Sequence, residues 1–265
     1  MLWNKVNYTA DISYLNNIFI TEYDISKCNI NVLFTKGAID ENTYKYLYNA
    51  ERMERQTFVG KLQKDKNIAD ILKAGIIEAK KMLFEANHVD DREVLSIKND
   101  AVFIINRKLQ YTKFGLIEFM PKGLYTSFYK LPGIEVYYYY NNVTKDEYID
   151  VKGISDSNVA KHETYFLQLL KDIFYSIQVN GPEIYLRMVK DSYKEYVSGK
   201  LPLGFYRKFD AKSVYHYRCK TAINTGFEAE YVPECDKNAL DISYNLSILM
   251  QIQKYIIAMY FNKNK

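Results

Sequence analysis

With 265 residues, 48% of them hydrophobic, the chain is long enough to bury the core of one large domain or two small ones. Its formal net charge of +4 permits an anionic partner without requiring one. No charged segment followed by an apolar run opens the sequence, and polar residues interrupt its most apolar stretch, so we expect neither a signal peptide nor a membrane span. The 26 tyrosines, with abundant Asn, Ile and Lys, indicate an AT-rich genome such as that of a phage.

The first strong signal is NIFITEYD, a run of β-branched and aromatic residues that predicts a strand with Asp24 at its end. CNINVLFTKG follows, which predicts either a short helix or a continued extended segment. Arg52, Arg55 and Lys61 then fall on one predicted short helix and its exit, where guanidinium groups can pair with phosphate oxygens or simply answer Glu51 and Glu54.

Residues 67–87 have helical periodicity. Apolar side chains recur on one face of this predicted helix, and its lysines are expected off that face. The apolar set is Ile68, Ile71, Leu72, Ile76, Ala79 and Leu83, and the lysines are Lys73, Lys80 and Lys81.

An antiparallel sheet is predicted for residues 94–151. VLSI and AVFII flank Lys98, Asn99 and Asp100, which predicts a hairpin that presents Asp100 at its tip. Further turn signals lie at residues 106–108, 121–123, 132–133 and 141–142.

Beyond Gly153 the pattern becomes helical. We predict helices over residues 158–179 and 182–197, the second closed by Gly199, then a loop over residues 201–209. The remainder to Phe261 is predicted helical with a turn at residues 225–236, packed on the protein or in a subunit contact. The expected fold is therefore α+β, an antiparallel sheet with helices on one face followed by a mostly helical segment.

The two predicted strand ends suggest a metal site. Two divalent ions about 4 Å apart can stabilise both the attacking and the leaving oxygen of a phosphoryl transfer, and aspartates are suitable ligands. Asp24 and Asp100 are the candidates, far apart in sequence and each at the end of a strand. The sequence therefore predicts that they bind Mg²⁺ as catalytic residues.

Three segments in this order resemble the motifs of the family B DNA polymerases, including the viral ones. That family reads D-x-x-S-L-Y-P-S-I, K-x-x-x-N-S-x-Y-G and Y-G-D-T-D-S-V-F; here the segments are YDISKCNIN, RMERQTFVG and SIKNDAVFI. Asp24 matches the metal-binding aspartate of the first motif and Asp100 the second aspartate of the third. Arg52 matches the lysine that meets the triphosphate, Gln56 the asparagine, and Gly60 the closing glycine, which would allow close approach of the template backbone.

The resemblance extends to VKGI, similar to the Lys-Gly-Ile that places Lys152 and Gly153 near primer and template. Lys98 replaces the first aspartate of the third motif, which leaves two carboxylates and a lysine able to meet nucleic acid. Asn29 stands where the family has the aromatic residue that excludes the 2′-hydroxyl, so ribonucleotides become possible substrates. The spacing of the motifs is compressed, which leaves room for fingers of only one short helical pair and none for an editing exonuclease.

The resemblance implies a palm-like domain with minimal fingers over residues 1–155 and a helical, thumb-like segment over 156–265. It implies a template-directed nucleotidyltransferase that extends a nucleic-acid 3′ end with Mg²⁺, nucleoside triphosphates and a primer–template, in the host-cell cytoplasm. The alternative is an inactive, polymerase-derived phage protein that binds nucleic acid or a host protein. A third reading, coincidental motifs in a phage protein that assembles with itself or neutralises a host factor, predicts Asp24 and Asp100 far apart in the fold.

Two further residue sets leave alternatives open. Cys28, Cys219 and Cys235 lack C-x-x-C spacing, so three reduced cysteines are expected, with a zinc site formed by the last two and His216 as the alternative. Lys200, Arg207 and Lys208 either grip duplex phosphates or are a solvated surface.

Overall fold

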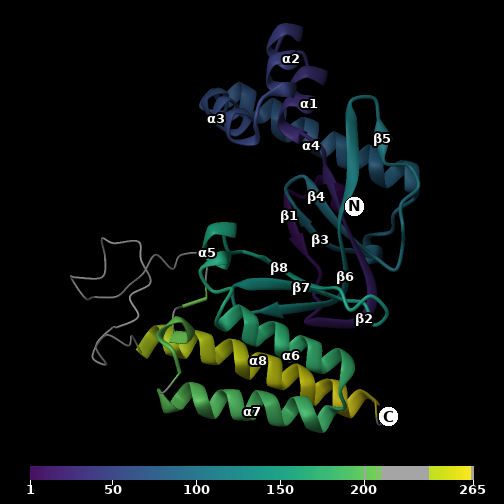
Figure 1. The fold of residues 1–265 in the computed structure, drawn as a ribbon. Helices are drawn as coiled ribbons and strands as arrows, with labels where there is room; N and C mark the ends of the chain where they lie inside the picture. The colour runs from purple at the N-terminus through teal and green to yellow at the C-terminus, as the bar shows by residue number, and fades with distance from the viewer. Residues whose placement is uncertain (200, 207, 210–238, 264–265) are drawn as a thin grey trace, which may run out of the picture. The chain divides into compact units, whose positions relative to one another are not determined.

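The computed structural model describes residues 1–199, 201–206, 208–209 and 239–263 (Figure 1). Helices are combined with strands that pair antiparallel, as the expected α+β class requires. The chain divides into two compact units. The first unit holds residues 1–12 and 18–124, and the second holds residues 13–17 and 125–265. The predicted boundary between palm and thumb at residues 155 and 156 falls within the second unit and stays a prediction.

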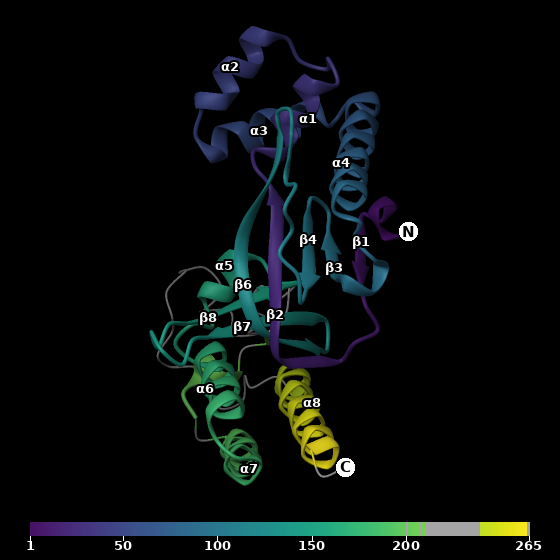
Figure 2. The ribbon, with the colours of Figure 1, turned by 90° about the vertical axis from the view of Figure 1, so that its right-hand side faces the viewer.

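The sheet of the first unit has the strand order β1-β3-β4-β2-β6, and short β5 pairs with β6 (Figure 2). At the end of β2 the Ser26 N–H donates to the Glu118 carbonyl of β6 at 2.8 Å. Strands β2 and β6 are long because each continues into the second unit. The bounds are Asn7–Thr9 for β1, Tyr14–Ile25 for β2, Val94–Lys98 for β3, Ala101–Ile105 for β4, Lys113–Phe114 for β5 and Ile117–Leu131 for β6.

Two helices of this unit, α2 and α4, begin at acidic caps. The Asp40 carboxylate accepts from the Thr43 N–H at 2.9 Å, and the Asp65 carboxylate accepts from the Asn67 N–H at 2.8 Å. A short helical pair, α2 and α3, thus separates α1 from α4. The bounds are Leu2–Asn4 for the 3₁₀ turn η1, Cys28–Thr35 for α1, Glu41–Asn49 for α2, Arg52–Leu62 for α3, Lys66–Asn87 for α4 and Asp91–Glu93 for η2.

Helices α1 and α4 pack on one face of this sheet around a common core. They approach closely at Gly75, where an added Cβ would lie only 2.3 Å from Val32 Cγ1. The apolar face predicted for α4 is confirmed at Leu72, Ile76, Ala79 and Leu83, which are buried. Lys80 was predicted off this face and is instead fully buried, because carbonyl groups from two distant segments receive its ammonium.

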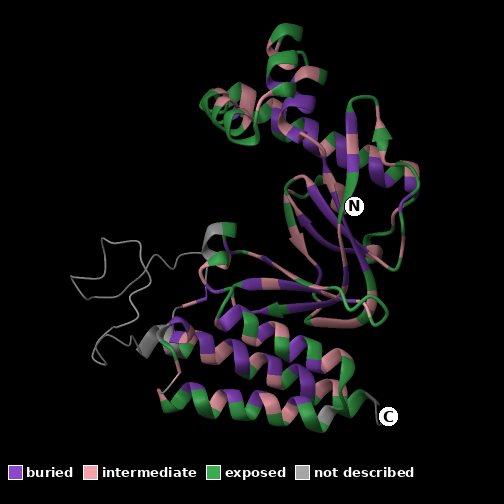
Figure 3. Ribbon diagram, viewed as in Figure 1, coloured by how far each residue is buried: buried purple, intermediate pink, exposed green. Residues whose placement is uncertain are grey.

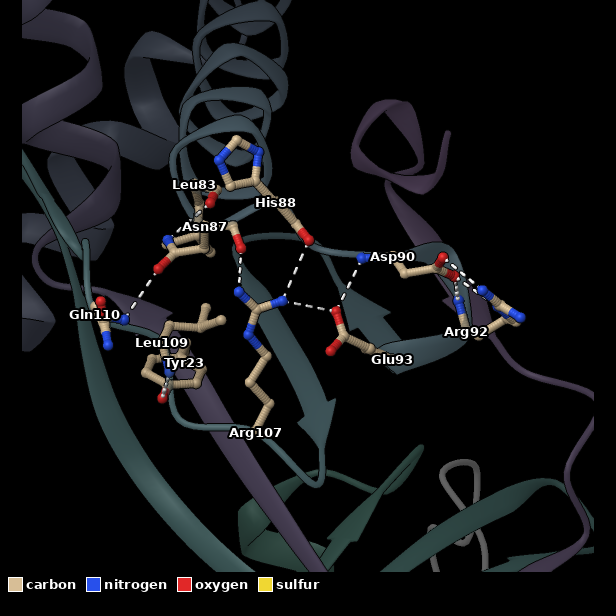
Figure 4. A network of polar contacts seen from close by, with 10 residues as sticks. All are labelled: Tyr23, Leu83, Asn87, His88, Asp90, Arg92, Glu93, Arg107, Leu109 and Gln110. Atoms are coloured by element: carbon tan, nitrogen blue, oxygen red, sulfur yellow. Dashed lines mark hydrogen bonds and ion pairs between the residues drawn. The ribbon is translucent and has the colours of Figure 1, made fainter.

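A polar network fixes the C-terminal end of α4 to the loop after β4 (Figure 4). The Asn87 side chain accepts from the Gln110 and Tyr111 N–H groups at 2.9 and 3.0 Å. Arg107 donates to the Asn87 carbonyl and, at 2.9 Å, to the Glu93 carboxylate. Within the same loop the Leu109 N–H donates to the Tyr23 hydroxyl of β2 at 2.8 Å. These bonds fix the direction of α4 against the sheet.

One predicted turn is wrong. Residues 121–123 were expected to turn, but Pro121 and Gly123 lie inside β6. Strand β6 pairs with β5 through residues 117–118 and with β7 through residues 127–131, so Pro121 lies between those two paired stretches. Proline is tolerated in a strand at positions where its missing N–H is not needed for pairing.

The second unit has the strand order β2-β6-β7-β8, with β7 at Ile134–Tyr140 and β8 at Glu147–Lys152. Helices α6 and α8 cover one face of this sheet, and α7 packs against both helices (Figure 3). The helices are α5 (Asp156–Ala160), α6 (Phe166–Val179), α7 (Pro182–Ser198), the 3₁₀ turn η3 (Leu203–Tyr206) and α8 (Ala239–Lys263).

Tyrosines build much of this second core. Tyr129 stacks on Phe174 with ring centroids 4.2 Å apart. Buried or half-buried hydroxyls meet backbone carbonyls, as Tyr244 does at Pro132 (2.6 Å) and Tyr196 at Phe205 (2.6 Å). The polar tip of each ring is thus satisfied while its body packs.

The helix predicted over residues 158–179 is interrupted at residues 161–165, between α5 and α6. There the His162 carbonyl accepts from the Tyr165 and Leu167 N–H groups instead of continuing the helical ladder. His162 is buried edge-on against Phe209 with ring centroids 5.0 Å apart.

Later predictions fare differently along the chain. The helix closed by Gly199 is confirmed, and the apolar C-terminal stretch forms α8, which buries Ile248, Leu249 and Ile252 in the core of the second unit. The turn predicted at residues 225–236 lies outside the described residues. None of the described helices combines the length and the apolar character needed to cross a membrane.

Candidate active site

Asp24 and Asp100 lie on one cleft of the first unit. Asp24 is the second-last residue of β2 and pairs with Ala101, the first residue of β4. Asp100 precedes Ala101 in the two-residue turn between β3 and β4, the hairpin that the sequence predicts. Asn99 adopts a left-handed φ of 55° in that turn, which asparagine tolerates, and its N–H donates to the Val6 carbonyl at 2.8 Å.

The cleft encloses about 300 Å³, at the lower end of the range for small-molecule sites, roughly 300–1,000 Å³. It lies between the end of β2, the start of α1, helix α3, the β3–β4 turn and β6. The residues predicted from sequence that line it are Asp24, Asn29, Arg52, Arg55, Gln56 and Asp100.

Burial and charge both act on the Asp100 carboxyl. Burial raises the pKa of Asp100, and the negative charge of Asp24 raises it further. Burial and the neighbouring Asp100 likewise raise the pKa of the Cys28 thiol well above its usual value, so Cys28 is a protonated donor to Asp100. Lys122 Nζ lies 3.3 Å from Asp24 Oδ2. Because the carboxylates raise each other's energy when both are ionised, the pair favours a bound cation.

Basic side chains also line the cleft. Arg52 is exposed, and within the described part of the chain its guanidinium makes no hydrogen bond or ion pair. Arg55 is half-buried and donates to the Ala50 carbonyl, which orients it, and Lys27 donates to the Tyr48 carbonyl at 2.8 Å. The cleft can therefore receive an anionic group as well as a cation.

The fit of a divalent ion can be judged from the donors. Among the residues that the structure describes, no group of three or more His, Cys, Asp or Glu side chains could hold a metal. Mg²⁺, however, commonly takes one or two carboxylates and completes its shell with substrate phosphates and water. The pair Asp24 and Asp100 supplies that minimum, with hard oxygen donors.

Two predicted residues of the first unit do not line the cleft. Gly60 is exposed on α3, and a Cβ there would meet nothing within 4 Å. Its glycine is therefore not explained by packing inside this chain. Lys98 extends from β3 toward β1, where its Nζ donates to Thr9 Oγ1 at 3.1 Å. Its assignment to nucleic acid stays a prediction.

Lys152 and Gly153 belong to the second unit, at the end of β8. Lys152 Nζ lies 2.6 Å from Asp150 Oδ2. Gly153 has a φ of 99°, which favours glycine. A Cβ at Gly153 would also lie only 2.9 Å from the carbonyl oxygen of Gly133, in the turn after β6. Their predicted contact with primer and template stays a prediction.

The remaining basic and cysteine candidates add little to the cleft. Lys208 Nζ lies 5.0 Å from the Tyr244 ring centroid. The other members of these two sets, Lys200, Arg207, His216, Cys219 and Cys235, lie outside the described residues.

Sequence reasoning missed three residues that shape the cleft: Lys122, Cys28 and Lys80. Lys122 was hidden in the wrongly predicted turn at residues 121–123. Cys28 was expected only as a reduced cysteine, although its place four residues after Asp24, at the start of a helix, indicated the same cleft. No local signal identifies Lys80, because the groups that receive its ammonium come from Lys5 and Asn99.

A family model described as the bacteriophage PBS1 gene 130 protein matches residues 1–258 of the chain. The description names a phage gene product, in agreement with the phage protein expected from composition, and it names no activity. No curated protein matches the chain.

Proposed function

The chain belongs to the family of the bacteriophage PBS1 gene 130 protein, and we propose that it is a minimal, palm-like nucleotidyltransferase that extends a nucleic-acid 3′ end. The observation that carries this proposal is the cleft itself. Two aspartates far apart in sequence line one cleft with two arginines, and the order of these residues along the chain is that of the polymerase motifs. The third reading of the sequence predicts Asp24 and Asp100 far apart, whereas both line the same cleft.

In this proposal Asp24 and Asp100 are the catalytic carboxylates and would hold Mg²⁺. The bound metal would supply Lewis-acid stabilisation of the charge that develops on the transferring phosphoryl group. Asp100 is partly buried, so its carboxylate acts from a fixed position at the tip of the hairpin. Asp24, which now contacts Lys122, would hold the metal together with Asp100, and Lys122 would then be available to a substrate phosphate.

The arginines of the cleft would bind the nucleotide. Arg52 and Arg55 lie one helical turn apart on α3 and present guanidinium groups suited to triphosphate oxygens. Gln56 extends the same face. Asn29, at the start of α1, lines the cleft without the bulk of an aromatic ring, so the proposal includes ribonucleotides as substrates.

The wider assignment follows the polymerase resemblance. Residues 1–155 would act as a palm with α2 and α3 as minimal fingers, and residues 156–265 as a thumb-like segment. Lys98, Lys152 and Gly153 would contact primer and template. The partners would be a primer–template and nucleoside triphosphates, which places the activity in the cytoplasm of the host cell.

Primer extension with the purified full chain tests the proposal. Wild-type protein with Mg²⁺ is expected to incorporate nucleotides, on DNA or RNA templates and with deoxy- or ribonucleotides tested separately. Asp24→Asn and Asp100→Asn should each abolish incorporation because each removes one of two metal ligands. Asp70→Asn, on the exposed face of α4, is the matched control and should retain full activity. Equal incorporation by the wild type and both cleft variants would refute the proposal.

Two observations favour a second function. Asp24 is already paired with Lys122, and Lys98 stands where the polymerase family has a third aspartate. A protein that kept the palm but lost turnover would show this arrangement and would bind nucleic acid or a host protein. A salt-dependent shift of DNA mobility without any incorporation by the wild type would select this function.

A further inference from the structure

We propose that Lys80 is a positioning residue of the cleft, whose buried ammonium holds the Asn99–Asp100 turn so that the Asp100 carboxylate can share a cation with Asp24. This inference rests on the proposed metal site and names the residue on which its geometry depends. Lys80 lies on α4 and does not line the cleft, so it would act through the turn rather than on substrate.

The burial of Lys80 is the first argument. Its side chain has 0% exposure, whereas Lys73 and Lys81 on the same helix are exposed. Removing an ammonium group from water is costly, and a lysine seldom remains in a core without a compensating role. An apolar residue here would complete the face formed by Ile76, Ala79 and Leu83.

The contacts of the ammonium show which parts of the backbone it holds. Lys80 Nζ donates to the Asn99 carbonyl at 3.1 Å and also to the Lys5 carbonyl. The Asn99 N–H in turn donates to the Val6 carbonyl at 2.8 Å. One side chain thus links α4, the segment before β1 and the turn that carries Asp100. Asn99 is held on both its N–H and its carbonyl, which fixes the residue immediately before Asp100.

Charge supports the same assignment. Burial lowers the pKa of Lys80 to about 8, while the negative charge of Asp100 and the nearby Cys28 act in the opposite direction. The ammonium is therefore mostly protonated at neutral pH, and its electrostatic partner is Asp100. Cys28 stays protonated beside it, since burial and Asp100 raise the pKa of that thiol.

Manganese binding measured by electron paramagnetic resonance on the full chain tests the inference. Lys80→Met should weaken Mn²⁺ binding by about 10-fold or more, the scale typical when a group that orients a metal ligand is removed. Lys80→Arg, which retains charge and donors, should restore part of the affinity. One control should bind like wild type: Lys81→Met, on the exposed face of the same helix.

The sign of the change separates positioning from simple repulsion. If Lys80 only competed with the metal as a second cation, its removal would tighten Mn²⁺ binding, so tighter or unchanged binding by Lys80→Met overturns the inference. Should Lys80→Met fail to fold, Lys80→Gln supplies a neutral donor in its place, and the same loss is expected. Absence of Mn²⁺ binding by wild-type protein also overturns it.

Kinetics distinguish this inference from the proposed function. In primer extension Lys80→Met should lower kcat while the KM for nucleotide stays unchanged, because Arg52 and Arg55 are untouched. Wild-type protein that binds Mn²⁺ without incorporating nucleotides would refute the enzyme and leave the positioning role standing. Full activity and full Mn²⁺ affinity in Lys80→Met would refute the positioning role and leave the enzyme standing.

Discussion

The cores of the two units differ in what they bury. Beneath the cleft, the first unit buries the Lys80 ammonium, close to partly buried Asp100 and the Cys28 thiol. The second unit buries aromatic and aliphatic side chains from β6 to β8 against α6 and α8. Both cores also contain fully buried tyrosine or phenylalanine rings, so the contrast lies in the charged groups.

This contrast indicates which core contributes more to stability. In an apolar core such as that of the second unit, every buried apolar group adds to the free energy of unfolding. Buried charges stabilise a fold less than an apolar core of the same volume, and clusters with shifted pKa values gather at functional sites. The buried charged groups of the first unit are thus better explained by a role in the cleft than by a contribution to the stability of the fold.

The largest expected effect tests the apolar side of the comparison. Phe174→Ala should lower the free energy of unfolding by about 3–5 kcal/mol, because it empties a fully buried site between Tyr129 and Tyr138. Urea denaturation measures the change. Tyr175→Ala, the partly exposed neighbour on α6, is the control and should cost clearly less. Equal losses for both variants would show that the second core is not close-packed.

The charged side is tested by pH. Lys80 has a pKa of about 8 when folded and the ordinary value of 10.5 when unfolded, so between these values the unfolded chain binds more protons. Stability from this group therefore rises with pH from about 8 to 10.5, by roughly 3 kcal/mol in total. Comparing the unfolding free energy of wild type with that of Lys80→Met at pH 7 and pH 10 isolates this group, since other titrations are shared. A constant difference would show that Lys80 is not buried as a charge.

Helix packing in the first unit gives a smaller effect. Gly75→Ala should destabilise the protein by about 1–3 kcal/mol, because its Cβ would overlap Val32 and push α1 away from α4. The change should also weaken Mn²⁺ binding, since α1 begins beside Asp24. Thermal unfolding and Mn²⁺ titration of the variant measure both effects. A variant as stable as wild type would mean that α1 and α4 separate without cost.

The smallest expected change has the opposite sign. Gly60→Ala should stabilise α3 by about 0.5–1 kcal/mol, since the position is exposed and open. If Gly60 admits the template backbone, the same variant should lose primer extension despite its greater stability. Greater stability with full activity would remove Gly60 from the proposed site.

Local signals in the sequence predicted much of the first unit. The hairpin around Asn99, the strand ending at Asp24 and the helix that carries Arg52 each depend on residues close together in sequence. The gathering of Asp24, Asp100, Arg52 and Arg55 in one cleft followed from the motif order, although no pattern in the chain fixes their distances.

The missed features depend on contacts between distant residues. Lys80 was placed with the solvated lysines. Helical periodicity cannot indicate that the carbonyls of Lys5 and Asn99 accept hydrogen bonds from its ammonium. Lys122 was assigned to a turn because Pro121 and Gly123 are turn residues, whereas both lie inside β6. The break before α6 likewise involves His162 packing on Phe209, many residues away.

The position of a bound divalent ion tests the central claim most directly. Crystals of the full chain soaked in Mn²⁺ with a non-hydrolysable nucleoside triphosphate should give an anomalous peak between the carboxylates of Asp24 and Asp100, with Lys122 withdrawn from Asp24. The triphosphate should lie against Arg52 and Arg55. An anomalous peak elsewhere, or none at this pair while the nucleotide is bound, would contradict the account.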